Sequence, residues 1–317
     1  MPPLVGIVLA RLVWGVVSLL AVSVIIFSAV EMLPGDFASA ILGQSATPEA
    51  LANLRHELGL DLPAGERFVR WLGGVIQGDF GISLSGRPVA EVVLPRMGHT
   101  LLLAGLAAGL ALPVAFALGV MAAARRGGWL DRVVNSSALA LAAMPEFLTG
   151  YLLIYWLAVR AGWLPPVAAI HDGMGAMEQA RRLVLPVITL SLVVMAHVLR
   201  MTRAALGELM ERPWMEMAGL KGLPRGYRVW RHALPNAWGP IANIFAFNIA
   251  WLISGVVVTE AVFVYPGAGQ LMVDAVASRD IPVVQACALI FAAVYIGLNL
   301  LADLVALLTN PRLRYPR

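Results

Sequence analysis

Residues 208–240, ELMERPWMEMAGLKGLPRGYRVWRHALPNAWGP, decide the fold and lie between two long apolar segments. Pro213 can open a short helix, because the first helical position has no intrahelical use for its N–H. Two glycines end this helix, and Pro224 opens a second one that is rich in arginine. Trp214 and Met217 fall near one face of the first helix. The stretch therefore predicts a helix-turn-helix beneath a membrane. Its apolar surface, bordered by basic residues, suits binding in a groove on a soluble partner.

The composition indicates a membrane protein. The 317 residues are 60% hydrophobic and 13% charged, and the mean hydropathy is +0.80. Apolar runs longer than about 18 residues are typical of membrane spans. The basic residues stand at the ends of apolar segments, so the net charge of +4 does not indicate nucleic acid as a partner. A single cysteine, Cys287, excludes an intrachain disulfide and a cysteine metal site.

We predict an all-α polytopic membrane protein with six transmembrane helices, at about 7–30, 99–124, 133–159, 184–206, 240–263 and 283–308. The first is too long for a signal-peptide core and is expected to be retained. Arginine and lysine gather after the second and fourth spans and at the chain end, which favours cytoplasmic termini. Arg181 and Arg182 would then lie outside and count against this topology. Pro113 and Pro145 are expected to bend or break their spans, and Gly105 and Gly109 to allow close helix approach.

Residues 32–98, between the first two spans, are moderately polar. A turn is expected at Leu33–Asp36, then a helix over Pro48–Leu58 with Thr47 as its N-cap, and then an amphipathic run that carries Phe68 and Trp71. The segment predicts a small helical cap on the extracytoplasmic face of the membrane.

The spacing of five residues in the opening stretch resembles the EAA loop of bacterial ABC importer permeases, E-x-A-x3-G followed by L-P: Glu216, Ala218, Gly222, Leu234 and Pro235. A-G-L-K-G at 218–222 and R-H-A-L-P-N-A at 231–237 are similar, more specifically, to the dipeptide, oligopeptide and nickel group. So are P-G-D, L-G-L-D-x-P and G-D-F-G-x-S in the cap, L-P-V-I-T-L and R-x-x-R in the fourth span, E-x-x-F-x-x-P-G-x-G at 260–269 and R-D-x-P at 279–282. Asn310 departs from the group's acidic residue before Pro311.

This resemblance implies the type I ABC importer permease fold in the bacterial cytoplasmic (inner) membrane. It divides the chain into 1–98, the first transmembrane helix plus the cap, and 99–317, a five-helix core that contains the coupling loop at 208–240. It implies a second homologous permease subunit, two ATP-binding subunits, an extracytoplasmic solute-binding protein and membrane lipid as partners. ATP and Mg would be bound by the partner subunits, because this chain contains no G-x-x-x-x-G-K-[ST] loop. The residues expected to couple to the ATPase are Trp214, Glu216, Met217, Ala218, Lys221, Gly222 and Arg225.

Three polar positions within spans are candidates for the translocation pathway. Glu146 follows Pro145 near the middle of the third span, where a charge costs about 2.5–3.5 kcal/mol and should face a cavity or a partner. A structural hydrogen bond is an equally weighted alternative. Asn248 and Ser254 either line the pathway or join helices. Outside, a tight turn or gate is expected from Pro266, Gly267, Gly269 and Asp280.

Two classes of transporter fit a chain of this kind. One is the pore subunit of an ATP-driven importer of peptides or similar small solutes, which works by alternating access. The other is an ion-coupled secondary transporter with Glu146 as its coupling carboxylate. The coupling loop favours the importer, because a secondary transporter needs no binding site for an ATP-binding subunit. Inverted repeats, which many secondary transporters contain, are also not evident. An enzyme is disfavoured: Ser254 and His197 alone do not make an intramembrane protease, and no metal-ligand spacing is present. The solute stays open among peptides, nickel complexes, glutathione, opines and heme precursors.

Overall fold

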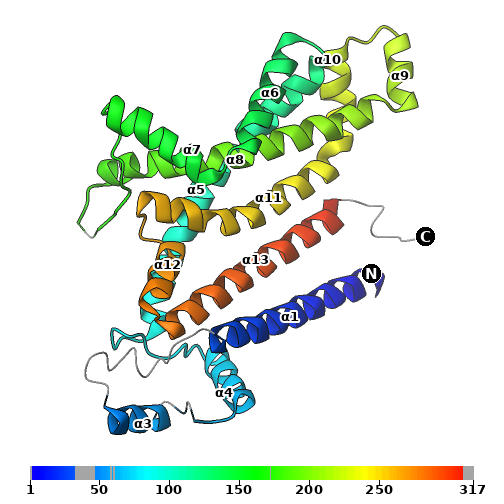
Figure 1. Ribbon diagram of the computed structural model, residues 1–317. Coiled ribbons are helices and arrows are strands. Elements are labelled where there is room, and N and C mark those ends of the chain that lie inside the picture. Colours follow the sequence, from blue (N-terminus) through cyan, green and yellow to red (C-terminus); the bar gives the residue numbers. More distant parts are fainter. Residues whose placement is uncertain (1, 33–46, 58, 60, 172, 310–317) are drawn as a thin grey trace.

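The computed structural model describes residues 2–32, 47–57, 59, 61–171 and 173–309 (Figure 1). These residues are almost entirely helical, and the β structure among them is an isolated bridge between Ile82 and Pro88. Several sequence predictions lie outside the described residues: the turn at Leu33–Asp36, two leucines of the L-G-L-D-x-P motif (Leu58 and Leu60), and Asn310–Arg312.

Five helices are long and apolar enough to cross a membrane, and a bent pair makes a sixth span. The five are α1 (Pro2–Glu31), α5 (Val89–Ala124), α8 (Ala176–Met210), α11 (Leu234–Phe263) and α13 (Ile281–Thr309). The bent pair is α6 (Trp129–Ala143) and α7 (Glu146–Leu153), and α7 continues as the π-helical segment η2 (Ile154–Arg160). The two halves meet at an angle of 105°. The break predicted at Pro145 is therefore confirmed, and six spans agree with the sequence prediction.

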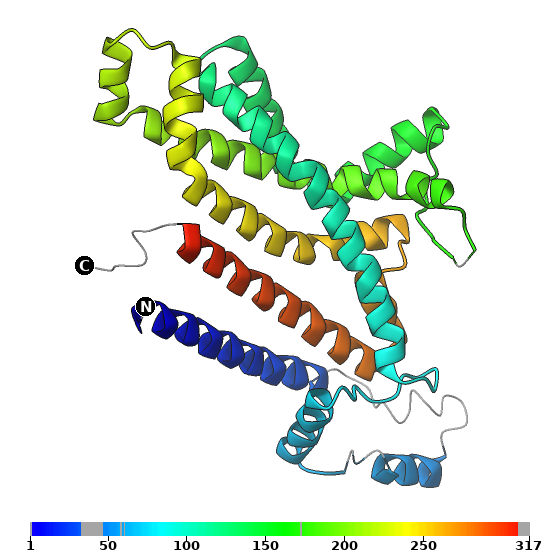
Figure 2. The same ribbon diagram turned by 180° about the vertical axis from the view of Figure 1, so that it is seen from behind.

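The helices pack around α8 and α11. α5 crosses α8, α11 lies between α8 and α13, and α1 packs on the outer side of α13 (Figures 1 and 2). α5 comes close to α8 at Gly119, where an added Cβ would lie 2.9 Å from the Leu199 carbonyl oxygen. Within the described part of this chain Gly105 and Gly109 face open space, so no other helix of that part approaches closely there.

The second span begins earlier than its hydropathy predicted. α5 starts at Val89, directly after Pro88, about ten residues before the expected start at 99. Arg96 and His99 interrupt the apolar run but not the helix, and α5 continues through Pro113 without a break. The division at 98/99 thus falls inside a helix, and it stays a prediction.

The cap is fixed to the end of α1. α3 (Pro48–Glu57) begins with the predicted N-cap, because the Thr47 hydroxyl accepts the Ala50 N–H at 3.2 Å. α4 (Ala64–Ile76) rests on α1 through Phe68, whose ring meets Phe27 edge-on at 5.4 Å between centroids. Two ion-paired side chains, Arg67 and Glu31, reinforce the contact. This arrangement fits the predicted cap.

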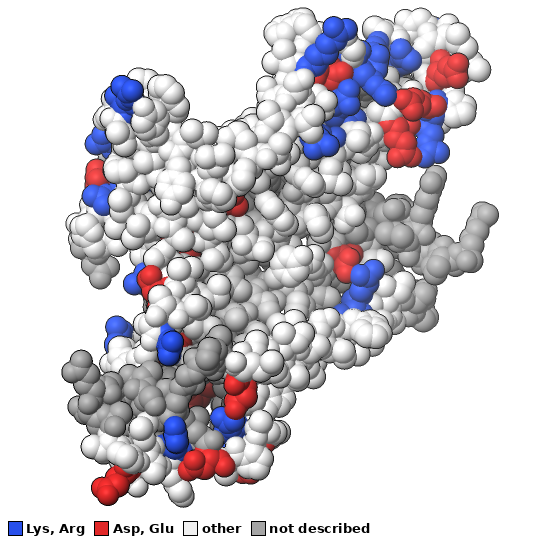
Figure 3. All heavy atoms as spheres, viewed as in Figure 1, with Lys and Arg blue, Asp and Glu red and all other residues white. Residues whose placement is uncertain are grey.

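Charged side chains avoid the middle of the molecule. Figure 3 shows most of them gathered at the α9–α10 end and again around α4 and the start of α8, with a largely uncharged band across the helices between; an exposed ion pair, Arg11–Asp303, joins α1 to α13 outside these two groups. Large apolar side chains of α1 are exposed in that band, including Trp14 and Ile25. An exposed apolar belt between two charged ends is the pattern of a chain that spans a lipid bilayer.

Candidate functional site

The coupling loop forms the predicted helix-turn-helix. α9 (Pro213–Leu220) has Pro213 at its first turn, and α10 (Arg225–Arg228) follows and continues as the π-helical segment η3 (Val229–Ala233). The turn between them requires glycine at Gly222, whose φ is +82°. The Leu223 N–H donates to the Ala218 carbonyl at 3.2 Å and closes the turn.

A buried methionine anchors α9 to the membrane helices. Met215 is fully buried in an apolar cluster with Leu206 of α8 and Ile241 of α11. The Arg228 guanidinium donates to the Met215 carbonyl at 3.3 Å. An added Cβ at Gly219 would lie 2.6 Å from that guanidinium, so a side chain here would displace the Arg228 guanidinium. The loop is therefore held firmly against both α8 and α11.

The opposite side of α9 is an exposed apolar face. Trp214, Met217 and Leu220 are 44%, 54% and 77% exposed, and their spacing places them on one side of the helix. The sequence predicted Trp214 and Met217 there but missed Leu220. Leu209 and Met210, at the end of α8, pack against the buried cluster. Among the other predicted coupling residues, Glu216, Lys221 and Gly222 are exposed, whereas Ala218 and Arg225 are partly buried.

A second anchor is an ion pair between α6 and α8, which was not predicted from the sequence. Asp131 of α6 is buried and accepts two hydrogen bonds from Arg203 of α8, at 2.6 and 2.9 Å. It also accepts the Gly127 N–H at 2.9 Å. A bidentate pair of this kind fixes the α5–α6 connection to α8.

At the other end of α11, a buried carboxylate organises the E-x-x-F-x-x-P-G-x-G turn. Glu260 accepts hydrogen bonds from the Thr100 hydroxyl at 2.7 Å and from the N–H groups of Gly269 and Gln270 at 2.7 and 3.1 Å. These N–H groups open α12 (Ala268–Ser278). Helix N-termini carry unpaired N–H groups, so a carboxylate placed there caps the helix.

The glycines of this turn are required by the same carboxylate. An added Cβ would lie 2.0 Å from a Glu260 carboxylate oxygen at Gly267, and 2.7 Å from the Val257 Cα at Gly269. The Pro266 carbonyl oxygen lies 2.9 Å from the His99 ring. The tight turn predicted at Pro266–Gly269 is thus present, and its role as a gate stays a prediction.

Burial, and secondarily the nearby Glu260 charge, raises the pKa of Tyr265 to about 12. The Tyr265 phenol therefore stays protonated at neutral pH. It donates to the His99 carbonyl at 3.1 Å. This bond holds the turn after α11 against α5.

Asp280 joins two motifs that lie about 200 residues apart. Its carboxylate accepts hydrogen bonds from the Ser83 hydroxyl and the Leu84 N–H, the latter at 3.0 Å. Ser83 ends G-D-F-G-x-S in the cap, and Asp280 belongs to R-D-x-P before α13. Asp280 therefore ties the cap to the α12–α13 junction, a contact that no local pattern could reveal.

Glu146 stands at the break between α6 and α7 and faces α11. It is partly buried and accepts a hydrogen bond from Thr259, and an added Cβ at Gly255 would lie 3.0 Å from its other oxygen. Thr259 is four residues from the end of α11 at Phe263, about 6 Å along the axis. Measured along α11, Glu146 therefore lies toward the Phe263 end of that helix, and its depth in the membrane stays a prediction.

The other two pathway candidates differ in their exposure. Ser254 is exposed on the side of α11 that also carries Phe247, Trp251 and Val258. Asn248 is buried and donates to the Ile244 carbonyl of its own helix at 2.8 Å. Ser254 thus lies on an exposed face of α11, and Asn248 does not.

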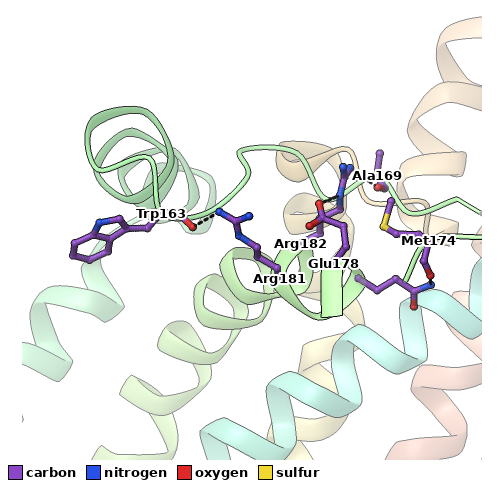
Figure 4. Close-up of polar contacts among 7 residues, drawn as sticks. Trp163, Ala169, Met174, Glu178, Arg181 and Arg182 are labelled. Carbon is purple, nitrogen blue, oxygen red and sulfur yellow. Dashed lines mark hydrogen bonds and ion pairs between the residues drawn. The ribbon is translucent and has the colours of Figure 1, made fainter. Parts of the chain in front are cut away.

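The arginines that counted against the expected topology hold the loop between η2 and α8 (Figure 4). Arg181 donates to the Trp163 carbonyl and Arg182 to the Ala169 carbonyl, both at 2.8 Å. Arg182 also pairs with Glu178 at 2.9 Å. The two guanidinium groups thus donate hydrogen bonds to carbonyl groups of the loop.

Comparison with known proteins agrees with these features. The N-terminal model of binding-protein-dependent transport system membrane components matches residues 4–100, and the model of their inner membrane component matches residues 115–315. The chain is 37% identical to "Probable peptide ABC transporter permease protein y4tP" of Sinorhizobium fredii, over 97% of this chain and 99% of that protein. It is 36% identical to "Glutathione transport system permease protein GsiC" of Escherichia coli, over 97% and 98% of the two chains.

These matches decide between the function classes. The chain is a multi-pass inner-membrane protein and the pore-forming subunit of an ABC importer, not an enzyme, and ATP is bound by partner subunits. They give no support to an ion-coupled secondary transporter. With its fold, its coupling loop and nearly full-length relatives in agreement, the chain belongs to the binding-protein-dependent transport system inner membrane component family.

Proposed function

We propose that this chain forms one half of a pathway that carries peptides or peptide-like solutes into the cytoplasm. A second homologous permease forms the other half, two subunits bind ATP with Mg²⁺, and an extracytoplasmic binding protein delivers the solute. The names of the relatives, a peptide permease and a glutathione permease, support this class of solute. Both termini and the coupling loop lie in the cytoplasm and the cap lies outside.

The coupling loop is the contact with the ATP-binding subunits. The observation that carries this assignment is the exposed apolar face of α9, on a helix whose other side is anchored by Met215. An exposed aromatic and aliphatic cluster suits a hydrophobic groove. Glu216, Lys221 and Arg225 add charges at its margin. A helix fixed to both α8 and α11 can pass movement of the motor to both.

Truncation of this face tests the assignment. Loss of a central aromatic anchor commonly costs about 2 kcal/mol or more, which is roughly thirtyfold in affinity. Trp214→Ala/Met217→Ala should therefore leave the protein inserted but weaken co-purification of the ATP-binding subunits and lower ATP-dependent uptake. Trp163→Ala is the matched control, since Trp163 is exposed at the opposite end of the molecule. Normal uptake by a well-expressed double variant would contradict the docking role.

The pathway runs along the open face of α11 near Ser254. A carboxylate among apolar residues within a membrane is favoured only where water, a partner or a ligand meets it. Glu146 has one hydroxyl donor in Thr259, which leaves capacity for a solute's ammonium group. The turn at Pro266–Gly269, with Asp280, lies on the outer side as the entry. The Asn248 side-chain amide donates its hydrogen bond to a carbonyl of α11, so we assign Asn248 to the structure of the helix and not to the pathway.

Glu146→Gln tests this pathway, because it keeps the shape and the Thr259 contact but removes the charge. Uptake of peptides with a free amino end should fall, while assembly of the complex and its basal ATPase activity stay intact. N-acetylated peptides are the matched control and should be affected much less. Equal effects on both kinds of peptide would return Glu146 to a structural role, and loss of assembly would show that it joins α7 to α11.

A further inference from the structure

A cavity opens between α6 and α8, away from Glu146. Its volume is about 310 Å³, and its lining consists of Asn135, His197, Arg200, Met201, Arg203 and Ala204. Arg200 is ten residues before the end of α8 at Met210, about 15 Å along the helix axis. The cavity therefore lies toward the coupling-loop end of the membrane region.

The cavity is cationic. Its Arg203 side chain is neutralised by Asp131, which binds it through two hydrogen bonds. None of the lining residues is acidic, and Arg200 is exposed with no ion pair recorded among the described residues. The Arg200 guanidinium is thus open to an oxyanion, and planar guanidinium groups bind carboxylates and phosphates through paired hydrogen bonds. His197 and Asn135 add polar groups beside it.

The cavity shares one face of α8 with Glu146. Leu190 marks that face, because an added Cβ at Gly255 would lie 3.0 Å from a Glu146 oxygen and 3.8 Å from the Leu190 side chain. His197 follows Leu190 by seven residues, which is two helical turns and returns to nearly the same side. Glu146 and the cavity therefore lie on the same side of α8, with the buried Leu190 and Val194 between them.

The α6 side of the cavity is also polar. Asn135 is followed by Ser136 and Ser137, and both serines are exposed. A helix face turned toward lipid tails is ordinarily aliphatic, whereas polar residues within spans face a bundle interior or a water-filled space. Of these three residues Asn135 lines the cavity, and its polar amide favours a pathway surface over a lipid-facing one at that position.

We infer that the α6–α8 cavity binds the carboxylate of the transported solute, with Arg200 as the main contact and His197 and Asn135 as supporting groups. The inference rests on the proposed function and extends it. A solute with both an amino end and a carboxylate would meet the Glu146 carboxylate with the first and the Arg200 guanidinium with the second. A phosphate of an anionic lipid offers the same chemistry, so the experiment separates the two sources.

The test compares a peptide that has a free carboxylate with the same peptide as its C-terminal amide. Uptake is measured in proteoliposomes that contain the whole complex, with the binding protein saturated by each peptide. Arg200→Gln should lower uptake of the free peptide about tenfold or more, as expected for loss of a charge-assisted contact. Uptake of the amide should change less than about twofold, and Arg200→Lys should restore part of the preference. Arg132→Gln removes an exposed charge outside the cavity lining and is the matched control.

Each other outcome overturns the inference in a different way. If wild-type complexes transport peptides and Arg200→Gln lowers uptake of both forms equally, Arg200 does not read the carboxylate. If the variant keeps the carboxylate preference but loses stimulation of ATPase activity by phosphatidylglycerol vesicles, the cavity binds lipid phosphate instead. If wild-type complexes transport neither peptide, the proposed function itself fails.

Discussion

Replacement of Glu260 tests how the turn after α11 is held together. Its buried carboxylate accepts hydrogen bonds from Thr100, Gly269 and Gln270. Glu260→Ala leaves the two backbone N–H groups without an acceptor, and each orphaned buried donor costs about 1–3 kcal/mol. The expected loss is therefore about 2–6 kcal/mol, before the cavity left by the side chain is counted. Because folded proteins are stable by only about 5–15 kcal/mol, a loss of this size is large.

Glu260→Gln is the matched comparison. The glutamine oxygen can keep both N–H bonds, and its amide group then faces the Thr100 hydroxyl. That hydroxyl already accepts the Ala268 N–H at 2.8 Å and can turn its own proton to the Arg96 carbonyl at 3.2 Å. Since a hydroxyl oxygen has two lone pairs, the network can be re-formed. The expected loss is below about 2 kcal/mol, the difference between charged and neutral hydrogen bonds.

The measurement is the fraction of purified complex that stays monodisperse in detergent after heating, together with ATP-dependent uptake. We expect Glu260→Ala to lose assembly at temperatures where Glu260→Gln and the wild type stay intact. Equal thermal stability of Glu260→Ala and the wild type would refute the capping argument. Equal damage by both substitutions would show that the charge matters more than the hydrogen-bond acceptors.

Two further predictions concern topology and the inner anchor. In a Cys287→Ala background, a membrane-impermeant thiol reagent should label His171→Cys from outside but not Lys221→Cys, and labelling of the latter in intact cells would reverse the topology. Asp131→Asn and Arg203→Gln should each lower thermal stability, because each leaves a partner's polar groups unmatched. The double variant should be little worse than either single one, whereas additive losses would show that the two residues act independently.

The sequence predicted correctly those helix starts, turns and breaks that a single proline or glycine determines. Pro213 opens α9, Gly222 takes a left-handed turn and Pro145 ends α6, each for a reason contained in the residue itself. The contacts that hold these parts together were not predicted. Asp131 and Arg203 are 72 residues apart, and Ser83 and Asp280 are 197 apart, so no periodicity connects them.

The depth of Glu146 shows a second limit of sequence reasoning. Its place in the middle of an apolar run indicated mid-membrane depth, which assumes a straight helix. The 105° bend between α6 and α7 removes that assumption, because the chain turns and no longer advances steadily across the membrane. A proline predicts that a helix breaks, but the bend angle depends on what the second half packs against. Here α7 packs on α8 and α11.

α11 connects the two ends of the molecule. Its first turns join the buried cluster beneath the coupling loop through Leu234 and Ile241. Its last turns hold Glu146 through Thr259 and cap α12 through Glu260. The helix is 30 residues long, about 45 Å, and well-packed helices move largely as rigid elements. A displacement of the loop would therefore reach the helix break and the outer turn together, which is the linkage that alternating access requires of a pore subunit driven from the cytoplasmic side.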